Sequence, residues 1–434
     1  MIDSNESALT FRTAHAADLD RLVEIHTSAF PDPRGHSERR RNFVANPLGP
    51  LDALWVAVDG GEIVAHAFLF ALRKWLAGSA IDVAAIASVG VAPEARGRGV
   101  ATQLLAHLHA KADAKKASVT MLYAFRQGFY AHHGYAPVTP SRLLRVHPAS
   151  IPSAWRREPG VALRAARNGD RAAIVDTYTR AAHRSHGWLL RPEALWDRAF
   201  ADERRTWTLA SRGKRIVGYA AWSLVQAESH AETRMVVHEV AADDDAARRA
   251  LFGAIGAQRD QVSEVEVDVD ARDPIDRALV DADRERFGTK ALEHAIGEIA
   301  AGPMVRLVDV ARAIGARKYP EDGAIDVAID GASALGAGTP RSDGAAGSER
   351  GPRSTPDLRP ALKVTISRGR AKVSVAERSR APLVIGRAAL GAVMFGGIAA
   401  SDAARLGWAH GEASTLARAD TLFATAPFFA LDSY

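Results

Sequence analysis

Cysteine is absent from the 434 residues of this chain. Its absence excludes disulfide bonds, thiolate metal sites and cysteine nucleophiles. Long hydrophobic runs are also lacking: those present, such as Leu390 to Ala400, are short and interrupted by glycine, so we expect no membrane-spanning helix. The first residues have neither the basic nor the apolar segment of a signal peptide, and we therefore expect a cytoplasmic protein.

Charge of one sign is not in large excess. The formal net charge is +5, which is small for this length. Such a balance favours small anionic molecules bound at local sites over a nucleic-acid-binding surface. The content of 47% hydrophobic and 25% charged residues is that of a globular protein, and the length predicts two or three domains.

A strand, a glycine-rich turn and a helix are predicted in succession between residues 89 and 105. Val89-Gly90-Val91 ends an apolar run, and Pro93 stops further strand pairing. Arg96-Gly97-Arg98-Gly99 forms the turn, after which apolar residues recur at helical spacing. Such a turn directs backbone N–H groups to one point, where the helix macrodipole also favours an anion. The stretch therefore predicts a pyrophosphate site.

The alternative is that Gly97 and Gly99 are turn residues only. We favour the anion site because Arg96 and Arg98 crowd one turn and would repel each other without an anion. Neither Gly-x-Gly-x-x-Gly nor Gly-Lys-Ser/Thr is present at this turn, which excludes the common dinucleotide and ATP motifs. The pattern Val-x-Val-x-Pro-x-x-Arg-x-x-Gly-x-Ala instead resembles the acetyl-CoA-binding motif of the GNAT acetyltransferases.

The first 150 residues predict an α/β layer with a mixed sheet, in the order strand, helix, helix, hairpin, strand, helix, strand, helix, strand. The same plan recurs over residues 151–300, as in a diverged internal repeat. In the second copy, Asp243-Asp244-Asp245 stands where the glycine turn would be. Three carboxylates would repel a pyrophosphate, so we predict that this copy keeps the fold and lacks the cofactor site.

The third region, residues 301–434, predicts an α+β unit with a hairpin at 362–375 and two helices after it. Residues from Gly331 to Pro356 have almost no large apolar side chain, and we expect a mobile loop over about 328–358. The chain ends in Phe428-Phe429-Ala430-Leu431-Asp432-Ser433-Tyr434. Chain ends are usually polar and frayed, so an aromatic and apolar end indicates a tail that docks.

Acetyl transfer from a thioester to an amine requires a polarised carbonyl, a deprotonated amine and an acid for the departing thiolate. The backbone of Val89–Val91 can pair with a pantetheine arm as a sheet edge pairs with a peptide, and one N–H can polarise the carbonyl. Tyr130 is the candidate acid, because a phenol with a pKa near 10 can donate to a thiolate. A packing role like that of Phe129 and Tyr135 is equally consistent with its position.

The base is less determined by the residue pattern. His66, Asp82, His132 and His133 are candidates, and each is at least as consistent with a surface or core role. The α-carboxylate of Tyr434 is a further candidate, because it is a free carboxylate at a fixed point of a tail that we expect to dock.

At whole-chain level the sequence resembles the Eis (enhanced intracellular survival) family of aminoglycoside N-acetyltransferases. The motifs that carry the resemblance are Val89 to Pro93 with Arg96 to Thr102, Phe129-Tyr130-x-x-x-Gly134-Tyr135-x-Pro137, Gly302 to Asp309 and the aromatic last residue. The resemblance covers nearly the whole chain. It implies an active GNAT domain at 1–150, a degenerate GNAT-like domain at 151–300 and a sterol-carrier-like domain at 301–434.

The resemblance also implies roles for individual residues. Tyr130 would be the general acid, the Tyr434 carboxylate the general base, and Asp32 would face a cationic amine substrate. Acetyl-CoA would be the cosubstrate with no metal, and the chain would form a homohexamer with no nucleic-acid partner. The residues implied to contact acetyl-CoA are Val89, Gly90, Val91, Arg96, Gly97, Arg98, Gly99, Val100, Ala101, Thr102, Phe125 and Arg126.

This chain departs from the family pattern near its end. Tyr434 replaces a phenylalanine, which should not affect a main-chain carboxylate, but Ser433 replaces an acidic residue that would help to bind a polycation. Two other functions therefore stay open: a protein-lysine or polyamine acetyltransferase, and a lipid-binding carrier with a vestigial acetyltransferase domain. The intact turn from Arg96 to Gly99 argues against the carrier, because residues 241–249 show how such a turn decays.

Overall fold

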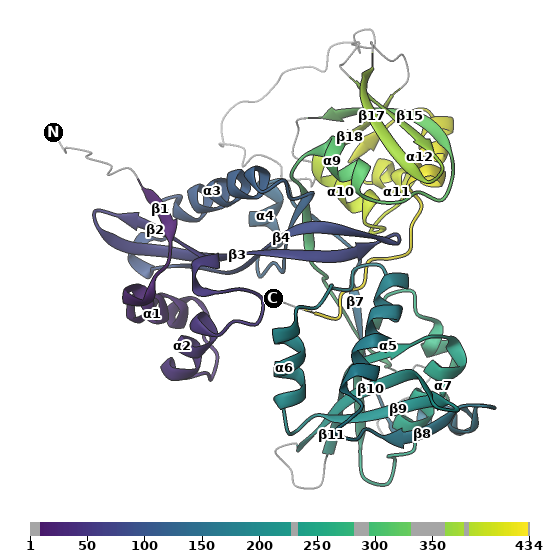
Figure 1. The fold of residues 1–434 in the computed structure, drawn as a ribbon. Coiled ribbons are helices and arrows are strands. Elements are labelled where there is room, and N and C mark those ends of the chain that lie inside the picture. The colour runs from purple at the N-terminus through teal and green to yellow at the C-terminus, as the bar shows by residue number, and fades with distance from the viewer. Residues whose placement is uncertain (1–8, 227–232, 282–294, 331–360, 377–381, 433–434) are drawn as a thin grey trace, which may run out of the picture.

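The computed structural model describes residues 9–226, 233–281, 295–330, 361–376 and 382–432, which form three units (Figure 1). Two units are built on seven-stranded mixed sheets and the third on a five-stranded sheet. The predicted fold class, two tandem α/β layers followed by a smaller α+β unit, is confirmed. Most of the predicted loop at 328–358 lies outside the described residues.

The first sheet has the strand order β1-β2-β3-β4-β5-β14-β6. Helices α1 and α2 lie on one side of it and α3 on the other (Figure 1). The elements of this unit are β1 (Thr10–Thr13), α1 (Leu19–Ala29), α2 (His36–Val44), β2 (Leu54–Asp59), β3 (Glu62–Leu76), β4 (Ser79–Val91), α3 (Val100–Ala114), β5 (Val119–Leu122), α4 (Gln127–His132), β6 (Ala136–Pro137) and β14 (Met304–Leu307).

Strands β4 and β5 separate near the middle of the sheet. They are parallel and pair only where Val83–Ala85 faces Val119–Met121. Strand β4 continues to Val91 and contains a bulge, at which Ser88 has a φ of 50°. Its last residues therefore have no strand on the β5 side within the described part of the chain, and their backbone groups on that side are available to a ligand.

The second sheet has the order β13-β7-β12-β11-β10-β9-β8. It repeats local features of the first: Arg164 pairs with Asp170 at 2.6 Å, as Arg12 pairs with Asp18 at 2.7 Å. Its elements are β7 (Ser141–Val146), β8 (Ala162–Ala165), α5 (Arg171–Arg184), α6 (Glu193–Ala201), β9 (Thr206–Arg212), β10 (Arg215–Gln226), β11 (Thr233–Ala242), α7 (Asp245–Gly256), β12 (Glu264–Asp270) and β13 (Gly297–Ala300).

Two strands pair with the unit on the other side of the predicted boundaries at 150 and 300. Strand β7 precedes the second unit's other elements and pairs with β12 and β13 in the second sheet. Strand β14 follows the second unit and pairs with β5 and β6 in the first sheet. Residues 141–146 therefore belong structurally with the second unit, and residues 304–307 with the first.

The third unit has the strand order β17-β16-β15-β18-β19 and shares a hydrophobic core with the first sheet. Val119 and Val305 of the first sheet lie in the same buried cluster as Leu390 of α10. The elements of this unit are α9 (Val310–Ala316), β15 (Gly323–Asp330), β16 (Ala361–Ser367), β17 (Arg370–Ala376), β18 (Leu383–Gly386), α10 (Arg387–Met394), α11 (Ala400–Arg405), β19 (Ala409–His410) and α12 (Ala413–Phe423).

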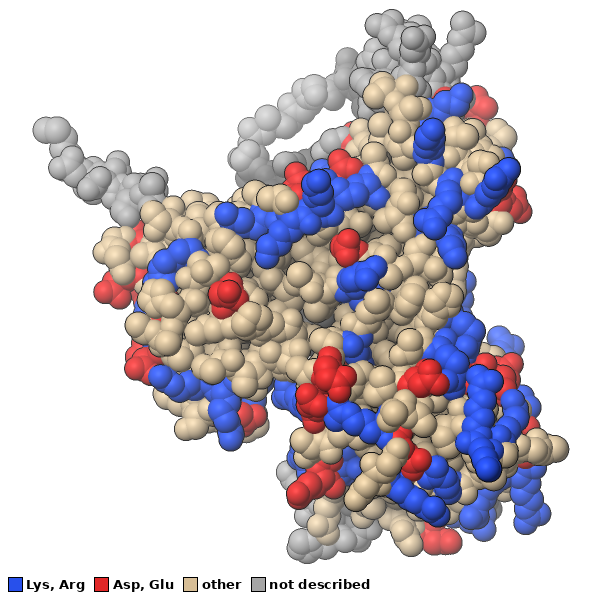
Figure 2. All heavy atoms as spheres, in the orientation of Figure 1, with Lys and Arg blue, Asp and Glu red and all other residues tan. Residues whose placement is uncertain are grey.

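Charges of both signs are mixed on the surface. On the face shown in Figure 2, Lys and Arg side chains are interspersed with Asp and Glu, especially over the second unit. Arg171, for example, is paired with Glu193 and Asp197. Among the described helices, none has both the length and the apolar character needed to cross a membrane.

Candidate active site

A cavity of about 860 Å³ opens between the end of α1, the end of β4 and the start of α3. Its volume is in the range of small-molecule sites. The residues that line it are Ser28, Ala29, Phe30, Pro31, Val89, Val91, Ala95, Arg96, Gly97, Gly99, Val100, Ala101, Thr102, Phe125, Arg126, Phe129 and Tyr130.

The glycine turn has the geometry that an anion site requires. Gly97 and Gly99 have φ values of 76° and 73°, in the left-handed region that favours glycine. Gly99 is the N-cap of α3 and makes no side-chain cap, so the first backbone N–H groups of this helix have no intrahelical partner. Nothing lies within 4 Å of the Cβ positions of either glycine. The turn, the helix dipole and the free edge of β4 together fit a pyrophosphate with its pantetheine arm.

The two arginines of the turn have protein partners. Arg98 Nη2 lies 2.6 Å from Asp59 Oδ2. Arg96 donates to the carbonyl oxygens of Ser28 and Val91 at 3.1 and 3.2 Å. The expectation that they would repel each other without an anion is therefore wrong, because each is held by neighbouring groups of the chain.

Of the predicted cofactor residues, all except Gly90 and Arg98 line the cavity. Arg98 is turned toward Asp59. Gly90 faces the other side of the sheet, where a Cβ would lie 2.7 Å from His66 Nε2. This difference follows from the alternation of side chains along a strand, which puts Val89 and Val91 on one face and residue 90 on the other.

Tyr130 lies on α4 in the wall of the cavity and is 2% exposed. Its ring contacts those of Phe125 and Phe129, with centroids 6.3 and 5.1 Å away. Burial raises the pKa of Tyr130 to about 12. No described group forms a hydrogen bond with its hydroxyl. The packing role and the functional role are thus compatible: the ring is buried and the hydroxyl is unengaged.

The candidate bases on the first unit are placed differently. His66 is fully buried against His26 and Phe43, outside the cavity wall, and burial lowers its pKa to about 3. Asp82 is exposed on the hairpin that joins β3 and β4, beside Arg73. The geometry brings neither residue to the cavity.

His132 and His133 lie closer to the cavity than His66 and Asp82 do. His132 Nδ1 is 2.6 Å from the carbonyl oxygen of Gly128, on the outer side of α4. His133 is half-buried, with Nε2 3.4 Å from Thr102 Oγ1 at the start of α3, and burial lowers its pKa. Tyr434 lies outside the described residues.

Asp32 is not a free carboxylate. Arg34 donates to Asp32 Oδ1 at 3.0 Å and Arg39 donates to the same oxygen at 2.9 Å. The hydrogen bonds from Arg34, followed by the Arg39 charge, lower the pKa of Asp32. Two arginines of its own chain thus pair with Asp32, and its role toward a cationic substrate stays a prediction.

Sequence reasoning did not single out Tyr123 or the cavity residues Phe30 and Pro31. Tyr123 follows β5 directly, and its hydroxyl donates to the backbone oxygen of Asp432 at 3.4 Å. Its position just after a strand that ends beside the site is the signal that could have identified it. The tail thus reaches the segment that also carries Phe125 and Arg126.

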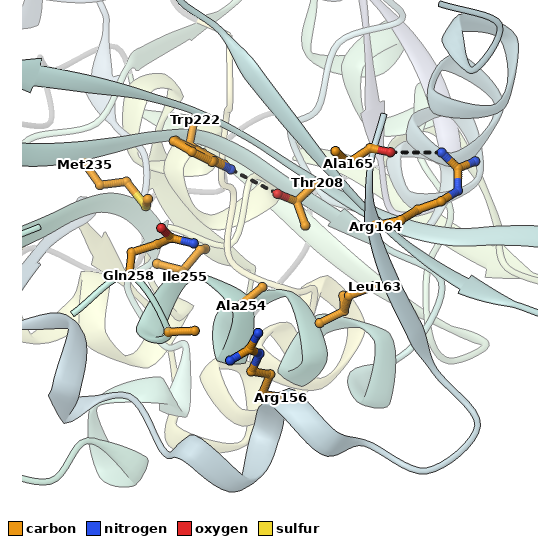
Figure 3. Close-up of a pocket in the computed structure, with 11 residues that line it drawn as sticks. Arg156, Leu163, Arg164, Ala165, Thr208, Trp222, Met235, Ala254, Ile255 and Gln258 are labelled. Carbon is orange, nitrogen blue, oxygen red and sulfur yellow. Dashed lines mark hydrogen bonds between the residues drawn. The ribbon is translucent and has the colours of Figure 1, made fainter. Parts of the chain in front are cut away.

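The second unit differs at the equivalent places. Asp244 caps α7 by accepting from Ala247 N–H at 3.0 Å, so a carboxylate already occupies this helix N-terminus. A smaller cavity of about 210 Å³ lies at the other end of α7, around Ile255 and Gln258 (Figure 3). There Trp222 Nε1 donates to Thr208 Oγ1 at 3.1 Å. A helix C-terminus repels anions, and this arrangement agrees with a second copy that lacks the cofactor site.

Comparisons with known proteins agree with this arrangement. Residues 10–138 and 187–307 each match an acetyltransferase (GNAT) domain family, and residues 310–430 match a sterol carrier protein domain. The N-acetyltransferase Eis of Mycobacterium tuberculosis is 26% identical over 296 residues, which cover 63% of this chain and 68% of that protein.

Solved structures show the same fold over the whole chain. A GCN5-related N-acetyltransferase from Anabaena variabilis superposes with a TM-score of 0.80 at 17% identity, covering 98% of this chain and all of that one. Eis1 from Mycobacterium abscessus superposes with a TM-score of 0.72 at 21% identity, with coverages of 98% and 100%. The chain is therefore an acyltransferase with two acetyltransferase (GNAT) domains and a sterol carrier protein domain, and its sequence is similar to that of the N-acetyltransferase Eis.

Proposed function

We propose that this protein transfers the acetyl group of acetyl-CoA to amines of a cationic acceptor such as an aminoglycoside, with Tyr130 as general acid and the Tyr434 carboxylate as general base. One observation carries the proposal. The buried phenol of Tyr130 lines the same cavity as the N-terminus of α3 and the free edge of β4. Acetyl-CoA supplies the acetyl group as a thioester.

The chain's own groups account for binding and polarisation. The N–H groups at the start of α3 would hold the pyrophosphate, and the edge from Val89 to Val91 would pair with the pantetheine arm. The bulge at Ser88 breaks the regular pairing of β4 with β3 and turns local backbone groups out of the ladder. A backbone N–H that is not used in the sheet can polarise the thioester carbonyl there.

Tyr130 suits the role of acid because burial keeps its proton. A pKa of about 12 means that the phenol is neutral at any physiological pH, so it can donate when charge develops on the departing sulfur. Its hydroxyl has no partner among the described groups that would have to be displaced.

The proposal of the base depends on how far the chain can extend beyond Asp432. Asp432 is held beside Tyr123, and an extended chain advances at most about 3.6 Å per residue. This short reach supports the proposal that the carboxylate two residues later is the base.

We propose that the chain assembles as a homohexamer and acts in the cytoplasm, as the family resemblance implies. Mass measurement in solution tests the assembly, and six times the chain mass of 46.4 kDa is the expected result.

The decisive experiment is an acetyl-CoA turnover assay with an aminoglycoside, a polyamine and a lysine-containing peptide. We expect thiol release to depend on the acceptor and to be fastest with the aminoglycoside. Faster turnover of the polyamine or the peptide would reassign the acceptor class, and acetyl-CoA that binds without turnover of any amine would contradict the enzyme mechanism.

A further inference from the structure

The described part of the tail, from Thr425 to Asp432, leaves the third unit and runs between the other two (Figure 1). Phe428 N–H donates to Thr139 Oγ1 at 3.1 Å, and Phe429 N–H donates to the carbonyl oxygen of His186 at 2.7 Å. The Phe428 side chain is buried. Backbone contacts thus fix the tail before it reaches Asp432.

The Asp432 carboxylate lies in a socket built by the second unit. Arg191 Nε donates to Oδ1 and Oδ2 of Asp432 at 3.0 and 3.2 Å. The same guanidinium pairs with Glu239, with Nη1 3.1 Å from Oε1, and its carbon lies 4.2 Å from the ring centroid of Tyr178. The side chains of Arg191, Glu239 and Asp432 are only 7%, 3% and 14% exposed.

The groups of this socket satisfy one another when Asp432 is present. Arg191 donates to the carboxylates of Glu239 and Asp432, while Tyr219 donates to Glu239 at 2.7 Å and Tyr178 donates to Asp432 at 3.3 Å. Buried charges are tolerated when they are paired and hydrogen-bonded. Removing the Asp432 carboxylate would take this acceptor from Nε of the buried Arg191, so the contact is a specific docking interaction.

The socket occupies a defined place in the repeat. In the first sheet, Gly90 faces His66 as the first pair after the β4 bulge. In the second sheet, Glu239 faces Ala221 as the first pair after the equivalent irregularity in β11. Glu239 therefore stands where the first sheet has Gly90, which faces His66 and not the cavity, so the second unit uses the corresponding face of its sheet to hold Asp432.

The first unit holds Asp432 from the other side. Tyr123 donates to its backbone oxygen at 3.4 Å, while Arg191 binds its carboxylate. The position of Asp432 is therefore set by both units.

We propose that Arg191, supported by Glu239, is a positioning residue that anchors Asp432 and thereby the tail that carries the proposed base. The degenerate second unit then has a function of its own, as the socket for Asp432. This inference rests on the proposed function, in which that carboxylate is the base.

The anchor is tested by trimming the end of the chain with a carboxypeptidase. We expect Asp432→Ala to release the terminal tyrosine several-fold faster than the wild type. The matched control is Asp170→Ala, which removes a carboxylate that is 16% exposed and paired with Arg164 through two hydrogen bonds of 2.6 and 2.7 Å, on the same unit but away from the tail. It should leave the trimming rate unchanged.

The positioning role is tested by steady-state kinetics on the same variants. Misplacement of a reacting group by about 1 Å can cost about 10²-fold in rate, so we expect Asp432→Ala to lower kcat to that extent while KM for acetyl-CoA stays the same. Because a loss of folded protein would also lower the apparent kcat at unchanged KM, circular dichroism must show the same folded content in the variant and the wild type. Arg191→Lys keeps a positive charge beside Glu239 but loses the planar donor pattern, and we expect both faster trimming and a lower kcat.

A chain extended past Tyr434 separates the two proposals. If the extended chain is inactive and Asp432→Ala keeps a wild-type kcat, the positioning role is wrong and the base stands. If the extended chain keeps full turnover, the base is wrong, and the catalytic purpose of Arg191 fails with it. If Asp432→Ala is trimmed at the wild-type rate, the anchor itself is wrong.

Discussion

Tyr130 combines two properties that conflict at most positions, a buried ring and a free hydroxyl. Because no described group bonds to the hydroxyl, Tyr130→Phe should leave the fold intact. General acids typically contribute about 10² to 10⁴-fold, so we expect kcat to fall within that range with little change in KM for acetyl-CoA. Steady-state kinetics with the preferred amine measures both parameters.

Tyr135→Phe is the matched control for this variant. Tyr135 is also buried, but its hydroxyl is 2.9 Å from His109 Nε2. The control should cost about 1 kcal/mol of folding free energy and leave kcat unchanged.

The raised pKa of Tyr130 keeps this acid protonated as the pH rises. A loss of kcat through deprotonation of an acid well below pH 10 would therefore contradict the assignment of Tyr130.

Single residues also show where sequence reasoning stops. The type and place of Tyr130 could be predicted, because it follows a strand next to the glycine turn. The state of Asp32 could not, since Arg39 reaches it from α2 and is itself fully buried. The pairing of Arg98 with Asp59, which lies at the end of β2, could not be predicted for the same reason: side-chain partners far apart in sequence leave no local pattern.

At the scale of elements, the start of α3 depends on the left-handed conformation of Gly99. A side chain at this φ of 73° costs about 1–2 kcal/mol, although nothing lies within 4 Å of the Cβ position. We expect Gly99→Ala to raise KM for acetyl-CoA, because relief of this strain reorients the N–H groups that face the cavity. Isothermal titration with CoA measures the same loss directly.

Gly35→Ala is the corresponding control. Gly35 is the N-cap of α2, has a φ of −75° and also has open space at its Cβ position. Equal effects of the two substitutions on CoA affinity would contradict a specific role for the turn at Gly99.

The turn itself was predictable because proline and glycine act locally. The separation of β4 from β5 was not, since it depends on where two strands stop pairing, at Ala85 and Met121. The bulge at Ser88 is likewise set by the pairing of β4 with β3.

At the scale of the whole molecule, the two large sheets exchange strands. A fragment of residues 1–150 lacks β14 and contains β7, whose partners lie in the second sheet. The open edge of β5 and the loss of the shared core should make this fragment aggregate. Circular dichroism and light scattering of the fragment would show it, and a soluble fragment with a cooperative melting transition would contradict the expectation.

A fragment of residues 1–309 is the control, because it contains the strands of both large sheets. We expect it to have much more ordered structure than residues 1–150, with apolar surface exposed where α10 covers β14 in the full chain.

The order of the units was predictable from the repeated strand and helix pattern. The exchange of β7 and β14, and the socket around Arg191, were not, because they join segments more than a hundred residues apart.

The place of β14 has a consequence for biosynthesis. Domains usually fold from the N-terminus as the chain leaves the ribosome. Here the first sheet cannot close until residues 304–307 have emerged, after the whole second unit has been made. A nascent chain that has not reached residue 307 would therefore have an incomplete first sheet, and activity would begin only after the second unit has been made.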